Sequence, residues 1–120
     1  MEQDKVEFNS VQFQGYLMNY QCHKPPARTL FSMTKCDKKL YIFGGILTEK
    51  FNDLWYIDLK GNITLISDPR KWYCIEPKGE IPSPRFGHTT VHFKKHLIIF
   101  GGKINTDQTL FREVYFYDIG

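Results

Sequence analysis

An apolar run that ends in two glycines occurs twice in this 120-residue chain. Residues 40–45 read LYIFGG and residues 97–102 read LIIFGG, so the two copies lie 57 positions apart. Four consecutive apolar residues of β-branched and aromatic character, stopped by glycine, predict a strand that is buried on both faces. The glycines suit a backbone that leaves the strand with positive φ, or one that passes too close to a neighbour for a Cβ.

The repeat extends beyond the glycines in both directions, and a fixed period of this length indicates a repeat architecture. Aligned without gaps, residues 25–45 and 82–102 are identical at eight of 21 positions. Further along, residues 53–58 (DLWYID) match residues 113–118 (EVYFYD) at an offset of 60. The three extra residues of the second copy precede this segment, where a loop can absorb them.

The second copy resembles a kelch repeat. Arg85 and His88 lie in the sequence RFGHT, Gly101 and Gly102 follow the apolar run, and residues 113–118 end in Tyr-Asp. The resemblance implies an all-β fold, namely a partial kelch-type β-propeller in which each repeat forms a four-stranded antiparallel blade. Kelch repeats place the histidine that His88 matches on the innermost strand, so its expected role is a structural hydrogen bond.

The first copy is similar to the second. Gly44 and Gly45 match the second glycine pair, and the later tryptophan, Trp72, is expected from the family pattern to lie on the fourth strand of this blade. Leu30 and Phe31 stand where the family has Gly and His. This departure concerns the first strand of the blade alone.

The resemblance covers residues 25–120 and divides the chain into three parts. Residues 25–81 are expected to form one blade, and residues 82–120 a second blade that lacks its fourth strand. Residues 1–24 contain alternating apolar side chains, which predicts a strand or short hairpin, the outer strand of a preceding or closing blade. A propeller needs at least four blades, or about 200 residues, so about one and three-quarter blades cannot close a ring without further blades.

Turn signals predict where the strands of each blade lie. We expect first strands at residues 29–36 and 86–93 and third strands at residues 53–59 and 113–119. For the fourth strand of the first blade two candidates remain, residues 63–66 and residues 72–75, because an Asp-Pro-Arg turn separates them.

Composition favours a folded intracellular module. The net charge of +3 is too small to predict a nucleic-acid partner, and the chain is 16% aromatic, as a packed core requires. Cys22, Cys36 and Cys74 are odd in number and form no Cys-x-x-Cys, which favours reduced thiols over disulfides. The charged first residues predict no signal peptide, and no apolar stretch is long enough for a membrane span. We therefore expect a cytoplasmic protein, with cytoskeletal association as an option, and no membrane partner.

No residue pattern predicts a catalytic, cofactor or metal site. His88, His92 and His96 recur every four residues, but a strand, a turn and another strand carry them, so they should not converge on a metal. Cys22 and His23 are neighbours in an extended segment and should point in opposite directions, which excludes a nucleophile–base pair. The expectation is a protein that is not an enzyme, with no cofactor and no metal.

Acidic residues recur at equivalent positions of the two repeats, as Asp53 and Glu113 and as Asp58 and Asp118. A catalytic pair would not need to recur in each blade. The recurrence therefore predicts that these carboxylates form hydrogen bonds from blade to blade.

The sequence favours a protein-interaction module, because propellers present loops to a partner while the blades stay rigid. The loops at residues 46–52 and 103–112 and the linker at residues 76–86 are the predicted contact segments. The predicted partner-binding residues, suited to a peptide or an acidic surface, are Lys50, Asn52, Lys103, Asn105 and Arg112. Two alternatives remain open: an architectural subunit of a cytoskeletal or ciliary assembly, whose blades other chains complete, and part of a propeller enzyme whose catalytic residues lie outside these 120 residues.

Overall fold

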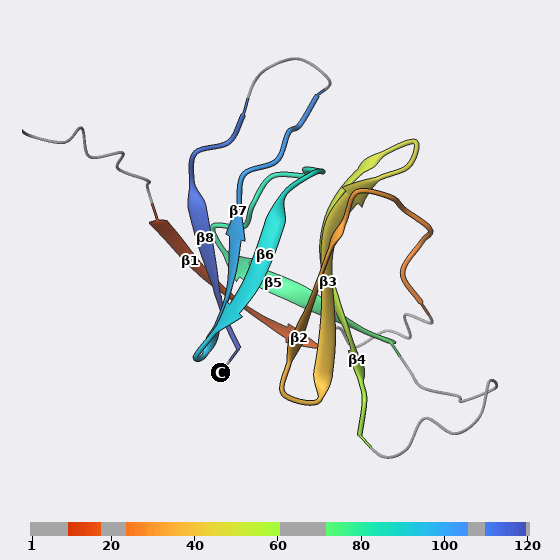
Figure 1. Ribbon diagram of the computed structural model, residues 1–120, viewed down its shortest axis with the longest axis vertical. Coiled ribbons are helices and arrows are strands. Elements are labelled where there is room, and N and C mark those ends of the chain that lie inside the picture. The colour runs from red at the N-terminus through yellow and green to blue at the C-terminus, as the bar shows by residue number, and fades with distance from the viewer. Residues whose placement is uncertain (1–9, 18–23, 61–71, 106–109, 120) are drawn as a thin grey trace, which may run out of the picture.

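The computed structural model describes residues 10–17, 24–60, 72–105 and 110–119, and these form eight strands. The strands are β1 (Ser10–Leu17), β2 (Ser32–Cys36), β3 (Lys39–Ile46), β4 (Lys50–Asp58), β5 (Trp72–Gly79), β6 (Thr89–Phe93), β7 (His96–Phe100) and β8 (Val114–Asp118). They join one sheet in the order β2-β3-β4-β5-β1-β8-β7-β6. The sheet curls until its two edge strands, β2 and β6, pack against each other, so the described chain is all-β and nearly closed (Figure 1).

The sheet contains two repeats of one meander. Strands β2 to β5 form a four-stranded antiparallel unit, here called blade 1, and β6 to β8 form a three-stranded unit, called blade 2. The first hairpin of each blade turns at a residue with positive φ, Asp37 (55°) in blade 1 and Lys94 (54°) in blade 2. The two copies therefore share the geometry of this turn, as expected for two repeats of one unit.

The first strand of each blade begins three residues later than predicted, at Ser32 and Thr89 instead of at residues 29 and 86. The residues before it pair with the segment after the glycines instead. Thr29 and Ile46 exchange two backbone hydrogen bonds of 2.8 and 2.9 Å, and Phe86 and Lys103 exchange two of 3.0 and 2.9 Å. The fourth strand of blade 1 is β5, so the second of the two candidate segments is the strand; the first lies outside the described residues.

Both glycine pairs have positive φ, as predicted. The angles are 67° and 105° for Gly44 and Gly45, and 79° and 86° for Gly101 and Gly102. In blade 1 the strand continues through the pair with a bulge after Phe43, whereas in blade 2 the strand ends before the pair. Positive φ is costly for residues that carry a Cβ, so glycine suits all four positions.

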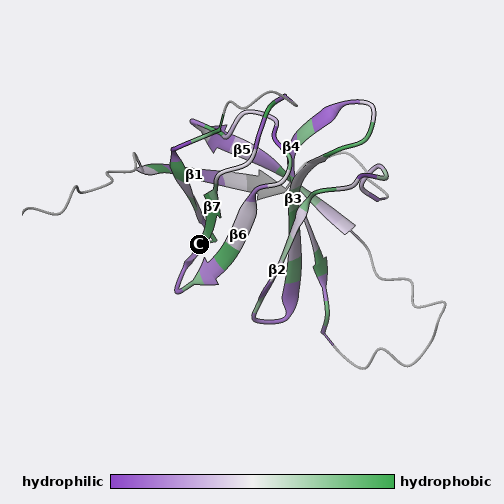
Figure 2. Ribbon diagram, turned by 45° about the horizontal axis from the view of Figure 1, so that its top comes forward, coloured by the Kyte–Doolittle hydropathy of each residue, from purple (hydrophilic) through white to green (hydrophobic). Residues whose placement is uncertain are grey.

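The core lies between the two blades. Its buried apolar side chains come from β1, β3, β4, β5, β7 and β8 and include Phe13, Tyr41, Phe43, Leu54, Ile75, Leu97, Ile99 and Tyr117. The middle strands β3 and β7 carry much of this hydrophobic surface (green in Figure 2).

The two middle strands differ in how they are covered. In β3, Ile42 and Phe43 point to opposite faces and are both buried. In β7, Leu97 and Ile99 are fully buried, but Phe100 is 39% exposed. Burial on both faces was expected for both copies and is wrong for the second, because blade 2 is covered only on the side that faces blade 1.

Strand β1 joins the outer strands of the two blades. It pairs antiparallel with β5 and parallel with β8, and so it occupies the place beside β8 where a fourth strand of blade 2 would lie. Phe13 anchors it, because its ring contacts those of Tyr115 and Tyr117 at centroid distances of 6.3 and 5.2 Å. Gly15 allows close approach to β5, since a Cβ there would lie 2.3 Å from Ile75 Cγ2.

Candidate partner-binding site at the loop end of the blades

The connections between strands gather at the two ends of the blades (Figure 1). One end, here called the loop end, holds the β3–β4 connection, the linker between the blades and the connection from β7 to β8. The opposite end, called the turn end, holds the tight β2–β3 and β6–β7 turns. The loop end contains the residues predicted to bind a partner.

A buried arginine holds the loop end of blade 2 in place. The Arg85 side chain is fully buried, and its Nε and Nη1 donate hydrogen bonds to Ser83 O (3.1 Å) and Gly101 O (3.2 Å). Its guanidinium carbon lies 3.8 Å from the centre of the Phe111 ring, a cation–π contact. Burial lowers the pKa of Arg85, although an arginine remains charged in this setting.

Arg28 performs the same task in blade 1. It donates to Pro26 O (3.1 Å) and Gly44 O (3.1 Å), and it lies 3.9 Å from the centre of the Phe51 ring. Arg28 also forms a bidentate ion pair with Asp53. In both blades an arginine therefore ties the entering linker to the glycine pair and to an aromatic ring, which is Phe51 at the start of β4 in blade 1 and Phe111 before β8 in blade 2.

The predicted role of the recurring carboxylates is wrong for Asp53. Its partners Arg28 and Trp55, whose Nε1 donates to Asp53 Oδ2 at 2.7 Å, belong to the same blade. The carboxylate stabilises the loop end of its own blade and does not join two blades.

Backbone hydrogen bonds and one histidine join the two blades. Arg85 N donates to Phe51 O (3.1 Å), Gly45 N donates to Arg85 O (2.8 Å), and Gly87 N donates to Leu30 O (3.0 Å). Gly44 has no room for a side chain here, since a Cβ would lie 2.9 Å from Arg85 O. The linker that enters blade 2 therefore packs directly on the glycine pair of blade 1.

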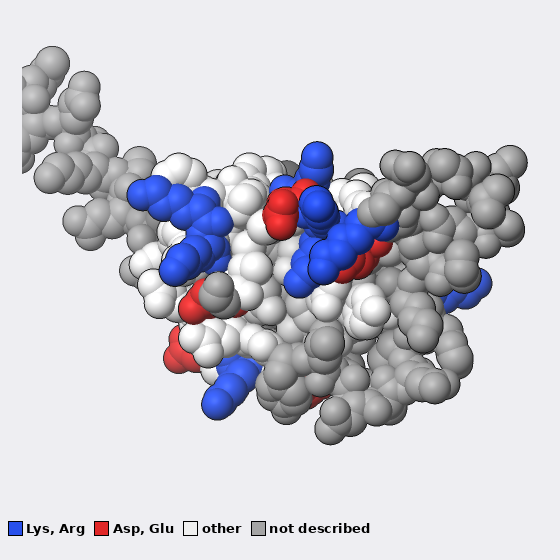
Figure 3. Space-filling model, turned by 90° about the horizontal axis from the view of Figure 1, so that it is seen from below, with Lys and Arg blue, Asp and Glu red and all other residues white. Residues whose placement is uncertain are grey.

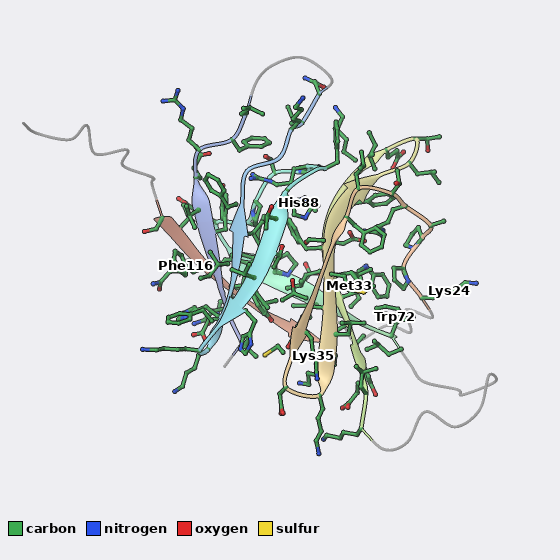
Figure 4. The ribbon with its side chains drawn as sticks, in the orientation of Figure 1. Lys24, Met33, Lys35, Trp72, His88 and Phe116 are labelled. Atoms are coloured by element: carbon green, nitrogen blue, oxygen red, sulfur yellow. The ribbon has the colours of Figure 1, made fainter. Side chains whose placement is uncertain are left out.

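His88 directly precedes β6, is buried at this junction and points toward blade 1 (Figure 4). Its Nε2 lies 2.9 Å from Phe43 O and 2.8 Å from Ser32 Oγ. Because a carbonyl only accepts, Nε2 carries the proton. Burial lowers the pKa of His88 to about 4, and among the described residues its Nδ1 has no hydrogen-bond partner. The structural hydrogen bond predicted for His88 is therefore present.

The five predicted partner-binding residues occupy different situations. Lys50 Nζ donates to Asn105 Oδ1 at 2.7 Å and so joins the loops of the two blades. Asn52 is half-buried, and its Nδ2 donates to Pro82 O at 3.1 Å, which fixes the linker. The Lys103 backbone pairs with Phe86 and Leu110, while Arg112 is exposed. The structure thus brings Lys50 and Asn105 together and leaves Arg112 open to a partner.

The loop end also carries exposed apolar side chains, which were not predicted from the sequence. Leu47 in the β3–β4 connection is 60% exposed, Leu110 before β8 is 62% exposed, and Ile81 in the linker is 36% exposed. An apolar residue inside an otherwise polar loop was the signal that could have identified them. Together with the nearby cations they make the loop end amphipathic.

The remaining predicted structural residue, Trp72, begins β5 and pairs with Ile57 of β4. It lies away from the loop end (Figure 4). The other candidates for chemistry are dispersed: His92 Nε2 contacts Lys94 O (2.7 Å), and His96 packs edge-on against Phe116. Within the described ranges no three His, Cys, Asp or Glu side chains are placed to hold a metal ion.

The turn end differs in character from the loop end. Basic side chains gather there beside acidic ones (Figure 3). The exposed turn residues include Asp37, Lys38, Lys94 and Lys95. Because this surface is charged and mainly basic, it serves as a reference against which binding at the loop end can be judged.

One protein-family model matches almost the whole chain, including every described strand. A family model described as the KLHDC2/KLHL20/DRC7 Kelch-repeats domain matches residues 2–120. Rho GTPase-activating protein gacHH of Dictyostelium discoideum is 34% identical over 89 residues, which are 73% of this chain and 5% of that protein. Kelch repeat-containing protein 2 of Saccharomyces cerevisiae is 38% identical over 81 residues, or 67% of this chain and 9% of that protein.

Leucine-zipper-like transcriptional regulator 1 of Homo sapiens is 32% identical over 96 residues, which are 79% of this chain and 11% of that protein. The chain therefore spans only a small part of the length of these relatives. The part of the chain that the structure describes contains no helix long and apolar enough to cross a membrane.

Proposed function

Because the chain belongs to the kelch-repeat family, we propose that it is a protein-interaction module whose loop end binds a partner protein. Domains of this family generally act as protein-interaction modules, and the rigid blades leave the loops free to recognise a partner. The observation that carries the proposal is the hydrogen bond between Lys50 and Asn105, which joins loops of both blades into one surface.

The chemistry of this surface selects the kind of partner. Lys50 and Arg112 supply positive charge, and Asn105 supplies an amide that can donate and accept. Leu47 and Leu110 expose apolar area that a partner could cover. Arginine is enriched among the residues that contribute most to binding, and the exposed leucines offer apolar area for a partner to cover, so the best partner is an acidic segment with apolar side chains.

The scaffold below the loops supports this function. Arg28 and Arg85 hold each linker against a glycine pair, so the backbone of both linkers is fixed before a partner binds. Binding by an ordered surface avoids the entropy cost of fixing mobile loops. The Cys36 thiol is not part of a disulfide, which suits a reducing compartment and supports a cytoplasmic setting for the module.

A peptide selection tests the proposal. Random peptides displayed on phage and selected against the whole chain serve as the probe. We expect the selected peptides to be acidic with apolar residues, and we expect Leu110→Ala and Arg112→Ala each to weaken their binding about tenfold, which is about 1.4 kcal/mol. Lys38→Ala at the turn end is the matched control and should leave binding unchanged.

The opposite result is equally clear. Selected peptides that bind the Leu110→Ala, Arg112→Ala double variant as tightly as the unmodified chain would place the binding surface elsewhere. Loss of affinity for Lys38→Ala alone would move it to the turn end.

A further inference from the structure

The outer face of blade 2 repeats a surface that is buried in blade 1. The two blades correspond position by position, so Val91 and Phe93 on β6 correspond to Thr34 and Cys36 on β2, and Phe100 corresponds to Phe43. In blade 1 this face packs against blade 2, and Cys36 and Phe43 are 8% and 2% exposed. In blade 2 the equivalent side chains are more exposed, at 49% for Val91, 61% for Phe93 and 39% for Phe100.

The glycine pairs show the same difference. A Cβ on Gly44 would lie 2.6 Å from His88 Cε1 and 2.9 Å from Arg85 O, both of which belong to blade 2. A Cβ on the equivalent Gly101 would meet no atom within 4 Å. The space beside Gly44 that the linker of blade 2 fills is therefore open beside Gly101.

Three backbone groups of blade 2 correspond to groups of blade 1 that form hydrogen bonds across the junction between the two blades, here called the internal junction. In blade 1 the Gly45 N–H, the Phe51 carbonyl and the Leu30 carbonyl bond to the linker of blade 2. Their equivalents in blade 2 are the Gly102 N–H, the Phe111 carbonyl and the Gly87 carbonyl. None of these three has a backbone partner among the residues that the structure describes.

Blade 1 presents the complementary groups on its own outer edge. In the internal junction the partners are the N–H and carbonyl of Arg85 and the N–H of Gly87. Their equivalents in blade 1 are the N–H and carbonyl of Arg28 and the N–H of Leu30. Within the described parts of the chain these three groups also lack a backbone partner, so the chain carries the backbone groups of both halves of one junction.

The side chains on the exposed side of β6 in blade 2 and of β2 in blade 1 are also complementary to each other. Thr90 of β6 contacts Ser32 and Thr34 of β2 in the internal junction. Met33, which is 53% exposed, is the equivalent of Thr90, and Val91 is the equivalent of Thr34. An apolar pair of Met33 and Val91 would therefore take the place of the polar contacts.

A second apolar pair follows from the same correspondence. The His88 ring lies edge-on to the Phe43 ring, with centroids 5.2 Å apart. Their equivalents at the open edges are Phe31, 37% exposed, and Phe100. Aromatic pairs of this kind add about 0.5–1.5 kcal/mol beyond their buried area.

We propose that the outer face of blade 2 binds the outer edge of blade 1 of a second copy of this chain. Figure 4 marks the two surfaces by Phe116 on blade 2 and Met33 on blade 1, which lie on different sides of the molecule. Because they are different surfaces, the contact is head to tail, and repetition closes a ring or continues as a filament.

Sedimentation velocity of the whole chain, from dilute to concentrated solution, tests the proposal. We expect the unmodified chain to form species larger than a monomer, in proportions that rise with concentration. Val91→Glu and Met33→Glu should each reduce the chain to a monomer, because each places a charge in one half of the junction. The exposure of both side chains means that thermal unfolding should be nearly unchanged.

Mixing the two variants is the sharper experiment. Val91→Glu retains an intact edge on blade 1, and Met33→Glu retains an intact face on blade 2, so together they should form a dimer and nothing larger. Leu47→Glu is the matched control, because Leu47 is 60% exposed but lies at the loop end. It should associate like the unmodified chain.

Three outcomes would overturn the proposal. The first is an unmodified chain that remains a monomer at every concentration. The second is self-association that survives Val91→Glu. The third is a mixture of the two variants that stays monomeric, which would mean that any association uses a symmetric contact instead.

Discussion

At the scale of single residues, the two repeats place different residue types at a position with the same left-handed backbone conformation. Leu30 and Gly87 precede the first strand of their blades and have left-handed φ angles of 56° and 69°. Glycine adopts this conformation without cost, whereas a residue with a Cβ is strained by about 1–2 kcal/mol. Leu30 is 55% exposed and recovers little of this cost by packing within the chain.

We therefore predict that Leu30→Gly stabilises the monomer. The relief of strain should exceed the extra flexibility of glycine in the unfolded chain, so the free energy of unfolding should rise by about 0.5–1 kcal/mol. Chemical denaturation in dilute solution measures this. Thr29→Gly is the control, since Thr29 has no positive φ and should lose stability. A loss for Leu30→Gly as large as that for Thr29→Gly would contradict the account of strain.

At the scale of elements, each glycine pair lets a strand approach the linker that precedes its blade. A Cβ on Gly102 would lie 2.9 Å from Phe86 O and 2.9 Å from His88 Cβ. Gly101 has open space in the same direction but shares the positive φ. The two positions therefore separate the cost of strain from the cost of a clash.

We predict that Gly102→Val lowers the free energy of unfolding by about 2–5 kcal/mol, the sum of a strained φ and an overpacked contact. In the monomer Gly101→Val should cost less, because strain acts there alone. Lys103→Ala should change stability by less than about 0.5 kcal/mol, as is usual for side chains near the surface. Urea denaturation of the three variants checks the order, and equal midpoints for Gly102→Val and Lys103→Ala would exclude a structural role for the glycine.

At the scale of the whole molecule, stability depends on the junction between the blades, where His88 is buried as a neutral ring. Its pKa is about 4 in the folded protein and about 6.5 in the unfolded chain. Below pH 6.5 the unfolded chain therefore binds a proton that the folded protein does not. The contribution of the neutral His88 ring to the free energy of unfolding is therefore complete above pH 6.5 and is lost as the pH falls toward 4.

We predict that this one group reduces the free energy of unfolding by about 3 kcal/mol between neutral pH and pH 4. The measurement is denaturation at a series of pH values for the unmodified chain and for His88→Gln, whose amide can still donate to Phe43 O. Carboxylates contribute equally to both pH profiles. The difference between the profiles should therefore equal the loss of unfolding free energy that His88 causes. His92→Gln is the control, and identical profiles for His88→Gln and the unmodified chain would refute the assignment.

Much of the fold was readable from the sequence by itself, because it depends on local geometry and on repetition. Glycine is the residue that positive φ requires, so the conformation of Gly44 and Gly101 followed from residue type. Apolar runs at a fixed spacing predicted the strands of both blades. The match of His88 to a repeat position predicted its hydrogen bond.

Only the tertiary structure decided which segments pair over long distances and which side chains remain uncovered. That β1 lies between β5 and β8 depends on pairing across the whole chain, which has no local signature. The partner of Asp53 turned out to be Arg28 of its own blade, since recurrence does not say which neighbour a carboxylate faces. Phe43 and Phe100 end the same apolar run, but only Phe43 is covered by another blade. Burial is set by the neighbours that the fold supplies, and two nearly identical sequences can differ in it completely.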